Sequence, residues 1–97
     1  MANISLNSMI YFIEDLKANA VKIGRTNDLI KRVQTLQTGN SHKIRCLYTI
    51  EAPDYFEQHI HSICTKYHKQ GEWFRLEAIT HLLKHPWFKK NMLKFRA

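Results

Sequence analysis

The chain has 97 residues, of which 44% are hydrophobic and 24% are charged, and its formal net charge is +7. A chain of this length can bury one core, and its apolar runs are too short to cross a bilayer, so we expect a single domain over residues 1–97 and no membrane partner. The start lacks the basic region and long apolar segment of a secretory signal, which favours an intracellular location in cytoplasm or nucleus. A small basic domain attracts polyanions, and nucleic acid is the partner that this charge favours.

The first predicted element is a β-hairpin formed by residues 9–13 and 21–26. If it closes over residues 15–18, Tyr11 lies opposite Lys22, with Cβ atoms roughly 5 Å apart. One face of the hairpin is then apolar, and the other carries a phenol beside an amine. A packed core has no use for such a titratable pair, so this face is a candidate reactive site.

Two helices and a third strand follow the hairpin. Asp28 and its neighbours offer a helix N-cap, and apolar residues then recur at helical spacing, which predicts a helix over residues 27–37. Alternating β-formers predict a strand over residues 43–51. A second helix is expected from Pro53, with an apolar stripe along one side and an end before Gly71.

The last third of the chain is less regular. Residues 72–76 indicate a short extended piece, residues 78–83 a short helix, and residues 86–97 a tail that interleaves aromatic and basic side chains. We therefore predict an α+β fold: a small three-stranded, mainly antiparallel sheet in the order β-β-α-β-α-α, with helices packed on one face.

Six polar residues have no structural role in this scheme: Tyr11, Lys22, Arg25, Arg32, Glu57 and His61. Glu57 and His61 are four residues apart on the second helix, so both can point along the sheet edge toward the hairpin. A phenol, an amine, a guanidinium and a carboxylate suit phosphodiester hydrolysis. They supply a base for water, cations for the phosphate and a ligand for one divalent metal.

Three sequence blocks carry a family resemblance: Val-Lys-Ile-Gly-Arg, Leu-Gln-Thr-Gly-Asn and Gly-Glu-Trp-Phe. With them, residues 9–76 resemble the GIY-YIG nuclease superfamily, in particular its short phage and viral branch. Ile10-Tyr11 and Lys22-Ile23-Gly24 stand at the two motifs that name that family, and Arg32 and Glu57 stand at its helical arginine and metal-binding glutamate. The resemblance implies a GIY-YIG-like nuclease domain that cuts DNA with one Mg²⁺ or Mn²⁺ ion, and its phage and viral branch implies an infected host cell as one location.

The resemblance also implies roles for single residues. Tyr11 would deprotonate or orient the attacking water, and Lys22 would lower the pKa of the phenol or position that water. Arg32 would hold the scissile phosphate, and Glu57 would ligate the metal. Arg25 is expected as a second phosphate contact. 

His61 is expected beside Glu57 or a phosphate, where it would support the site. Two departures from the family pattern stand out. Lys22 replaces the tyrosine of the second motif, and Gln70 and Glu72 occupy a region where many members have an asparagine.

Two other hypotheses stay open at this stage. One is a nucleic-acid-binding module that keeps the scaffold and has lost turnover, and the other is a basic protein-interaction domain. If the chain is an endonuclease, we expect its specificity to come from substrate shape, from a homodimer or from a partner protein, with weak sequence preference.

Overall fold

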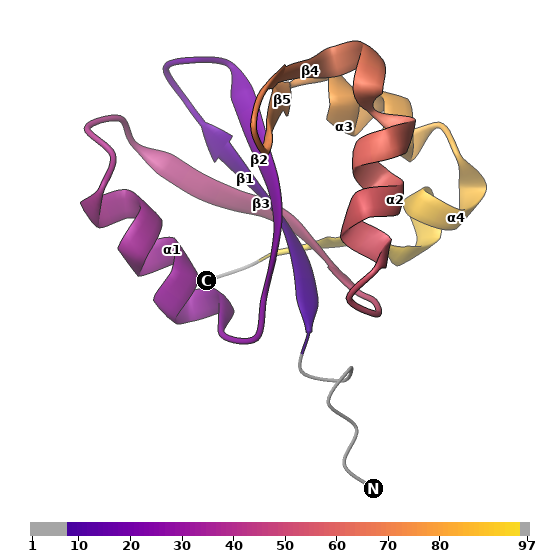
Figure 1. Cartoon of the computed structure of the whole chain (residues 1–97), viewed down its shortest axis with the longest axis horizontal. Coiled ribbons are helices and arrows are strands. Elements are labelled where there is room, and N and C mark those ends of the chain that lie inside the picture. Colours follow the sequence, from indigo (N-terminus) through magenta and orange to yellow (C-terminus); the bar gives the residue numbers. More distant parts are fainter. Residues whose placement is uncertain (1–7, 96–97) are drawn as a thin grey trace, which may run out of the picture.

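The computed structural model describes residues 8–95, so residues 1–7 and 96–97 of the predicted domain and tail lie outside the described part. Within it, one antiparallel sheet has the strand order β4-β5-β2-β1-β3-β6 (Figure 1). The strands are β1 Met9–Asp15, β2 Ala20–Thr26, β3 Ile44–Glu51, β4 His68–Gln70, β5 Trp73–Arg75 and β6 Leu93–Lys94. The helices are α1 Leu29–Thr38, α2 Phe56–Ile63, α3 Glu77–Leu83 and α4 Pro86–Asn91, with a 3-10 turn at Thr65–Tyr67.

The sheet has six strands in the described residues, so the prediction of a three-stranded sheet was wrong. The class, α+β with an antiparallel sheet, is confirmed. The added strands β4, β5 and β6 have three residues or fewer. Strands this short show no alternation that a sequence pattern can reveal, although β5 lies within the extended piece predicted at residues 72–76.

Helices cover both faces of the sheet, which corrects the expectation of helices on one face. Figure 1 shows α1 against one face and α2, α3 and α4 on the other. The four residues Ile10–Ile13 of β1 are all fully buried, because β1 is a central strand whose two sets of alternating side chains enter two different clusters. Tyr11 and Ile13 pack under α1, whereas Ile10 and Phe12 pack under the other helices.

The hairpin of β1 and β2 is shifted by two residues from the predicted register. Tyr11 pairs with Gly24, and Lys22 pairs with Ile13. The cause lies in the turn, where the Asp15 carboxylate accepts hydrogen bonds from the amides of Lys17 and Ala18, both at 3.0 Å. A two-residue shift preserves the alternation of faces, so Tyr11 and Lys22 still lie on the same side of the sheet, diagonal to each other.

The helix predictions were correct in place and partly wrong in length. Asp28 caps α1 by accepting a hydrogen bond from the Lys31 amide at 3.1 Å, as expected from the sequence. Helix α2 begins at Phe56 and ends at Ile63, because the 3-10 turn and β4 take up the rest of the predicted helix. None of the helices among the described residues is long and apolar enough to span a membrane.

Candidate functional site at the edge of β2

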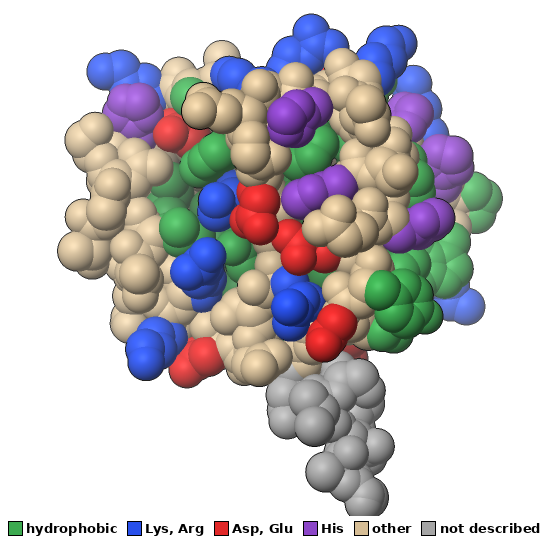
Figure 2. All heavy atoms as spheres, viewed as in Figure 1, with side chains coloured by type: hydrophobic (Ala, Val, Ile, Leu, Met, Phe, Trp, Pro, Cys, Tyr) green, Lys and Arg blue, Asp and Glu red, His purple; other side chains and the backbone are tan. Residues whose placement is uncertain are grey.

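The candidate site lies where β5 stops pairing with β2. β5 pairs with β2 only from Ala20 to Lys22, which leaves the next residue, Ile23, at an open edge. The Ile23 amide donates to the Glu72 carbonyl at 3.0 Å, and the Ile23 carbonyl faces His61 Nε2 at 2.8 Å. Side chains from both faces of the sheet meet at this edge, and Figure 2 shows basic and acidic side chains intermingled there, between α1 and α2.

On the α1 side, Tyr11 and Arg32 form a direct pair. Arg32 Nε donates to the Tyr11 hydroxyl at 3.3 Å. Tyr11 is fully buried over Gly24, where an added Cβ would collide with the phenol ring and its hydroxyl. Glycine at this position therefore makes room for the phenol of Tyr11.

The environment of Tyr11 keeps its hydroxyl protonated. Burial raises the pKa of Tyr11 above its usual value of 10.0, and the hydrogen bond from Arg32 lowers it only in part. The same hydrogen bond raises the pKa of Arg32. Arg32 is the cation that lowers the pKa of Tyr11 against the effect of burial. The role expected for Lys22, which was to lower the pKa of the phenol or to position the water, stays a prediction.

Lys22 lies between a carboxylate and an aromatic ring. Its Nζ is 3.5 Å from Glu72 Oε1 and 5.4 Å from the centre of the Trp73 ring, which is the residue opposite Lys22 in the β2–β5 register. The ion pair and the cation–π contact fix the ammonium at the edge of the sheet.

On the α2 side, Glu57 is a partly buried carboxylate. Its side chain is 13% exposed, with Arg25 Nε at 4.0 Å and His61 Nε2 at 3.8 Å. Burial raises the pKa of Glu57, and hydrogen bonding with the neighbouring Glu72 carboxyl and the negative charge there raise it further. His61 and Arg25 offset part of this effect.

His61 and Arg25 have partners besides Glu57. The short contact of His61 is with the Ile23 carbonyl, and its ring packs on Phe74 with centroids 5.0 Å apart, so it ties α2 to the sheet. Arg25 Nη1 donates to Asp54 at 3.4 Å. His61 therefore has a positioning contact at the site, and the Arg25 side chain is 36% exposed.

All six residues singled out from the sequence thus join one network of contacts, but two members were missed. Asp54 and Glu72 contribute carboxylates from loops that precede α2 and β5. Glu72 follows Gly71, whose φ of 57° makes the tight turn between β4 and β5. Pairing the extended piece at residues 72–76 with β2 would have revealed Glu72, because that pairing brings its neighbour Trp73 opposite Lys22.

The donor set at the site suits a hard divalent cation with few protein ligands. No group of three or more His, Cys, Asp or Glu side chains arranged to hold a metal occurs among residues 8–95. Mg²⁺ and Mn²⁺ in phosphate-processing sites commonly use one or two carboxylates, with water and phosphate oxygens as the other ligands. Glu57, with Glu72 close to it, fits this pattern.

Fold and site together define a small basic α+β domain with one polar network at a sheet edge, where buried carboxyl and phenol groups face three cations. A model of the T5orf172 domain matches residues 8–89, so the chain belongs to that family. Searches of curated proteins and of solved structures found no match.

The family match corrects the resemblance to the GIY-YIG superfamily, which was wrong as an assignment, because the matching model is that of a different family. The motifs that carried the resemblance are only two to five residues long. Short strand-and-turn segments of this kind recur wherever alternation and tight turns are required, so they do not define a family. The matched family is consistent with a function related to nucleic acid, and its name with a phage origin.

Proposed function

We propose that the protein is a divalent-metal-dependent endonuclease that hydrolyses DNA phosphodiester bonds, with structure-directed or weak sequence specificity. One observation carries the proposal: Tyr11, Lys22, Arg32 and Glu57 come from four elements and meet in one network. Tyr11 and the partly buried Glu57 both have raised pKa values, and the charge of Glu57 is one of the causes acting on Tyr11. Perturbed groups of this kind are typical of functional sites.

The cations are arranged to bind a phosphate. Tyr11 engages Arg32 at Nε, so the N–H donors of the two terminal amino groups remain for two phosphate oxygens. Lys22 adds a point charge on the other side of Tyr11. Arg25, which is about one third exposed, is a second contact for the same nucleic acid strand.

Tyr11 acts in this proposal as a hydroxyl rather than as a phenolate. Because its pKa is raised, the group keeps its proton at neutral pH and orients the attacking water by hydrogen bonding. Water then adds to phosphorus and one P–O ester bond breaks, which leaves a phosphate monoester and an alcohol. Arg32 stabilises the charge that develops on the phosphate oxygens.

Glu57 is the proposed ligand for one Mg²⁺ or Mn²⁺. The ion would supply positive charge to the phosphate and make its bound water more acidic. Glu57 must be ionised to hold a cation, and Arg25 and His61 favour that form.

The test is cleavage of nicked, branched and plain duplex DNA by the pure protein, with Mg²⁺, with Mn²⁺ and with EDTA. We expect metal-dependent cleavage that Glu57→Gln abolishes. Glu77→Gln removes the same charge from an exposed position on α3 and should cleave normally. Absence of cleavage on all substrates, or equal activity in both variants, would disprove the proposal.

A catalytically silent nucleic-acid-binding module is the second candidate, and the complete burial of Tyr11 favours it. A fully covered hydroxyl reaches a water only if the surrounding side chains move. This candidate predicts DNA binding that weakens with salt and in Arg32→Ala, and that does not depend on metal. Binding with no turnover under any metal condition would select it over the endonuclease.

A further inference from the structure

The Glu72 carboxylate lies close to the ammonium of Lys22 and the hydroxyl of Tyr11. Its Oε1 lies 3.5 Å from Lys22 Nζ. A Cβ added to Gly24 would lie 2.9 Å from the same oxygen and would also collide with the Tyr11 hydroxyl. The hydroxyl in turn contacts Arg32 Nε. A carboxylate oxygen therefore lies beside the ammonium and the phenol, with the guanidinium next in line.

The charges of the site balance locally. Lys22 pairs with Glu72, Arg25 pairs with Asp54, and Glu57 lies near Arg25. The chain as a whole carries +7, so the excess positive charge lies outside these pairs. A phosphate that enters the site must compete with the carboxylate of Glu72 for Lys22.

The side chain of Glu72 can leave without disturbing the fold. Its backbone carbonyl is fixed by the Ile23 amide at 3.0 Å, whereas its side chain is 39% exposed. Lys22 is more enclosed, at 16%, and it keeps its contact with the Trp73 ring when Glu72 turns outward. The cation thus stays in place while its anion is exchanged.

We propose that Glu72 is an internal anion that occupies the phosphate position of the site, and that a DNA phosphate displaces its side chain toward solvent. Glu72 is then a specificity-determining residue. Its carboxylate competes with small anions for Lys22, whereas a polyanion such as DNA displaces it. This inference rests on the proposed function, since it names the ligand of the same site.

The test compares Glu72→Gln with Glu77→Gln and the wild-type chain in binding to fluorescent duplex DNA, in EDTA and over a salt series. Glutamine keeps the shape of the side chain and removes its charge, and Glu77→Gln corrects for the change in net charge. We expect Glu72→Gln to bind about threefold to tenfold tighter at low salt, because one competing ion pair is removed. Its log K against log salt slope should steepen by up to about one unit, since the displaced carboxylate of the wild-type chain takes up a cation that glutamine does not.

Two further measurements keep the inference separate from the proposed function. If the protein cleaves DNA, Glu72→Gln should have a lower KM than Glu77→Gln. Tighter binding by Glu72→Gln without cleavage by either protein would refute the endonuclease and support the role of Glu72.

Two other outcomes would overturn the role of Glu72 alone. One is cleavage by both proteins with equal or weaker DNA binding in Glu72→Gln. The other is loss of metal-dependent activity in that variant, which would make Glu72 a metal-positioning residue instead. If neither protein binds DNA, both proposals fail. Equal melting temperatures of the two variants are the control for folding.

Discussion

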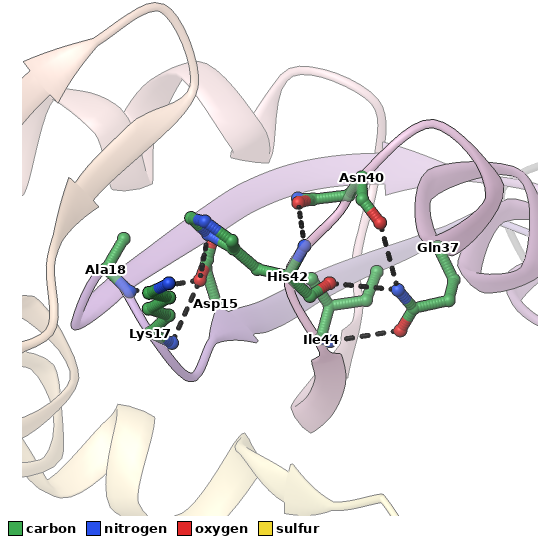
Figure 3. A network of polar contacts seen from close by, with 7 residues as sticks. All are labelled: Asp15, Lys17, Ala18, Gln37, Asn40, His42 and Ile44. Carbon is green, nitrogen blue, oxygen red and sulfur yellow. Dashed lines mark hydrogen bonds and ion pairs between the residues drawn. The ribbon is translucent and has the colours of Figure 1, made fainter.

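The two ends of the β1–β2 hairpin hold carboxylates in opposite ways. At the turn, Asp15 accepts two backbone hydrogen bonds and lies 3.0 Å from His42 Nδ1 (Figure 3). Burial alone would raise the pKa of Asp15, but the Ala18 amide, His42 and the Lys17 amide together lower it below its usual 3.8. The ionised carboxylate is the form that this end of the molecule stabilises.

The same end satisfies its loop with two amide side chains, and that of Asn40 accepts from the His42 amide at 2.9 Å. Gln37 donates to the carbonyls of Asn40 and His42 and accepts from the Ile44 amide at 3.0 Å, as Figure 3 shows. These contacts fix the loop between α1 and β3 against the hairpin turn. Both ends of the Gln37 amide have hydrogen-bond partners, so we interpret this network as structural.

At the open edge of β2 the arrangement is reversed. The ion pairs of Lys22 and Glu57 are longer, at 3.5 to 4.0 Å, and the pKa values of Tyr11 and Glu57 are raised by burial. The fold pays free energy to keep these groups there. One network thus lowers the pKa of a carboxyl and stabilises its ionised form, and the other raises the pKa values of Tyr11 and Glu57.

The largest expected effect appears when one cation is removed at each end of the β1–β2 hairpin in two separate variants. Arg32→Ala should lower cleavage roughly 100- to 1,000-fold, because the phosphate loses a donor that stabilises its charge in the transition state. Arg45→Ala removes the same charge from the partner of Glu14 near the turn and should leave the rate within about twofold. Single-turnover rates on one DNA substrate measure both. Similar losses in the two variants would show that general basicity, and not the site, drives the reaction.

Gly24→Ala should have the next largest effect, on stability. The new Cβ would collide with the fully buried Tyr11 ring, and overpacking of this kind costs about 1–3 kcal/mol. Gly39→Ala is the matched control, since its Cβ would lie 3.8 Å from the Thr35 carbonyl at an ordinary φ of −86°. Urea unfolding of both variants gives the comparison, and equal free energies of unfolding would contradict the close packing of Tyr11 on β2.

Asp15→Asn probes the structural end. Because the pKa of Asp15 is lowered in the folded state, its carboxylate stabilises the fold above pH 3.8, and this contribution is lost as the pH falls through the folded value. We expect a loss of roughly 1–2 kcal/mol at pH 7 that shrinks toward pH 3. Asp54→Asn, at an exposed pair 3.4 Å long, should change the free energy of unfolding by less than about 0.5 kcal/mol. A loss in Asp15→Asn that is independent of pH would exclude the charge as its cause.

The sequence predicts the elements whose signal is local. The alternation in β1, β2 and β3 and the Asp28 cap of α1 arise from neighbouring residues, so these elements were placed within a few positions. The edge strand β4 was missed because it has only three residues, whereas β5 lies within the extended piece predicted at residues 72–76. The edge strand β6 pairs with β3, far away in the chain, which no local pattern records. The same limit explains why the sequence did not predict that helices cover both faces of the sheet.

The candidate site was largely predictable for a related reason. An error of two residues in the hairpin register preserves the face of each side chain, so Tyr11 and Lys22 were assigned to one side despite the wrong pairing. Glu72 was missed because it approaches through the β2–β5 pairing. The raised pKa of Tyr11 was missed because it depends on burial under α1, which is a tertiary property.

The smallest expected effect is a shift in the pH dependence at the open edge. Burial and Glu72 raise the pKa of Glu57 above 4.5. Ionisation of Glu57 therefore lowers the free energy of unfolding as the pH rises from 4.5 through the pKa of the folded state. We expect cation binding to increase over the same pH interval. Glu72→Gln removes one cause of the raised pKa, and the acidic limb of the cleavage profile should move to lower pH. Glu57→Gln should remove the loss of stability over that interval, as measured by unfolding at several pH values without metal. If the limb stays in place in Glu72→Gln while Glu57→Gln abolishes the stability change, the two carboxyls titrate independently, and the contrast with the Asp15 end would rest on burial of Glu57 alone.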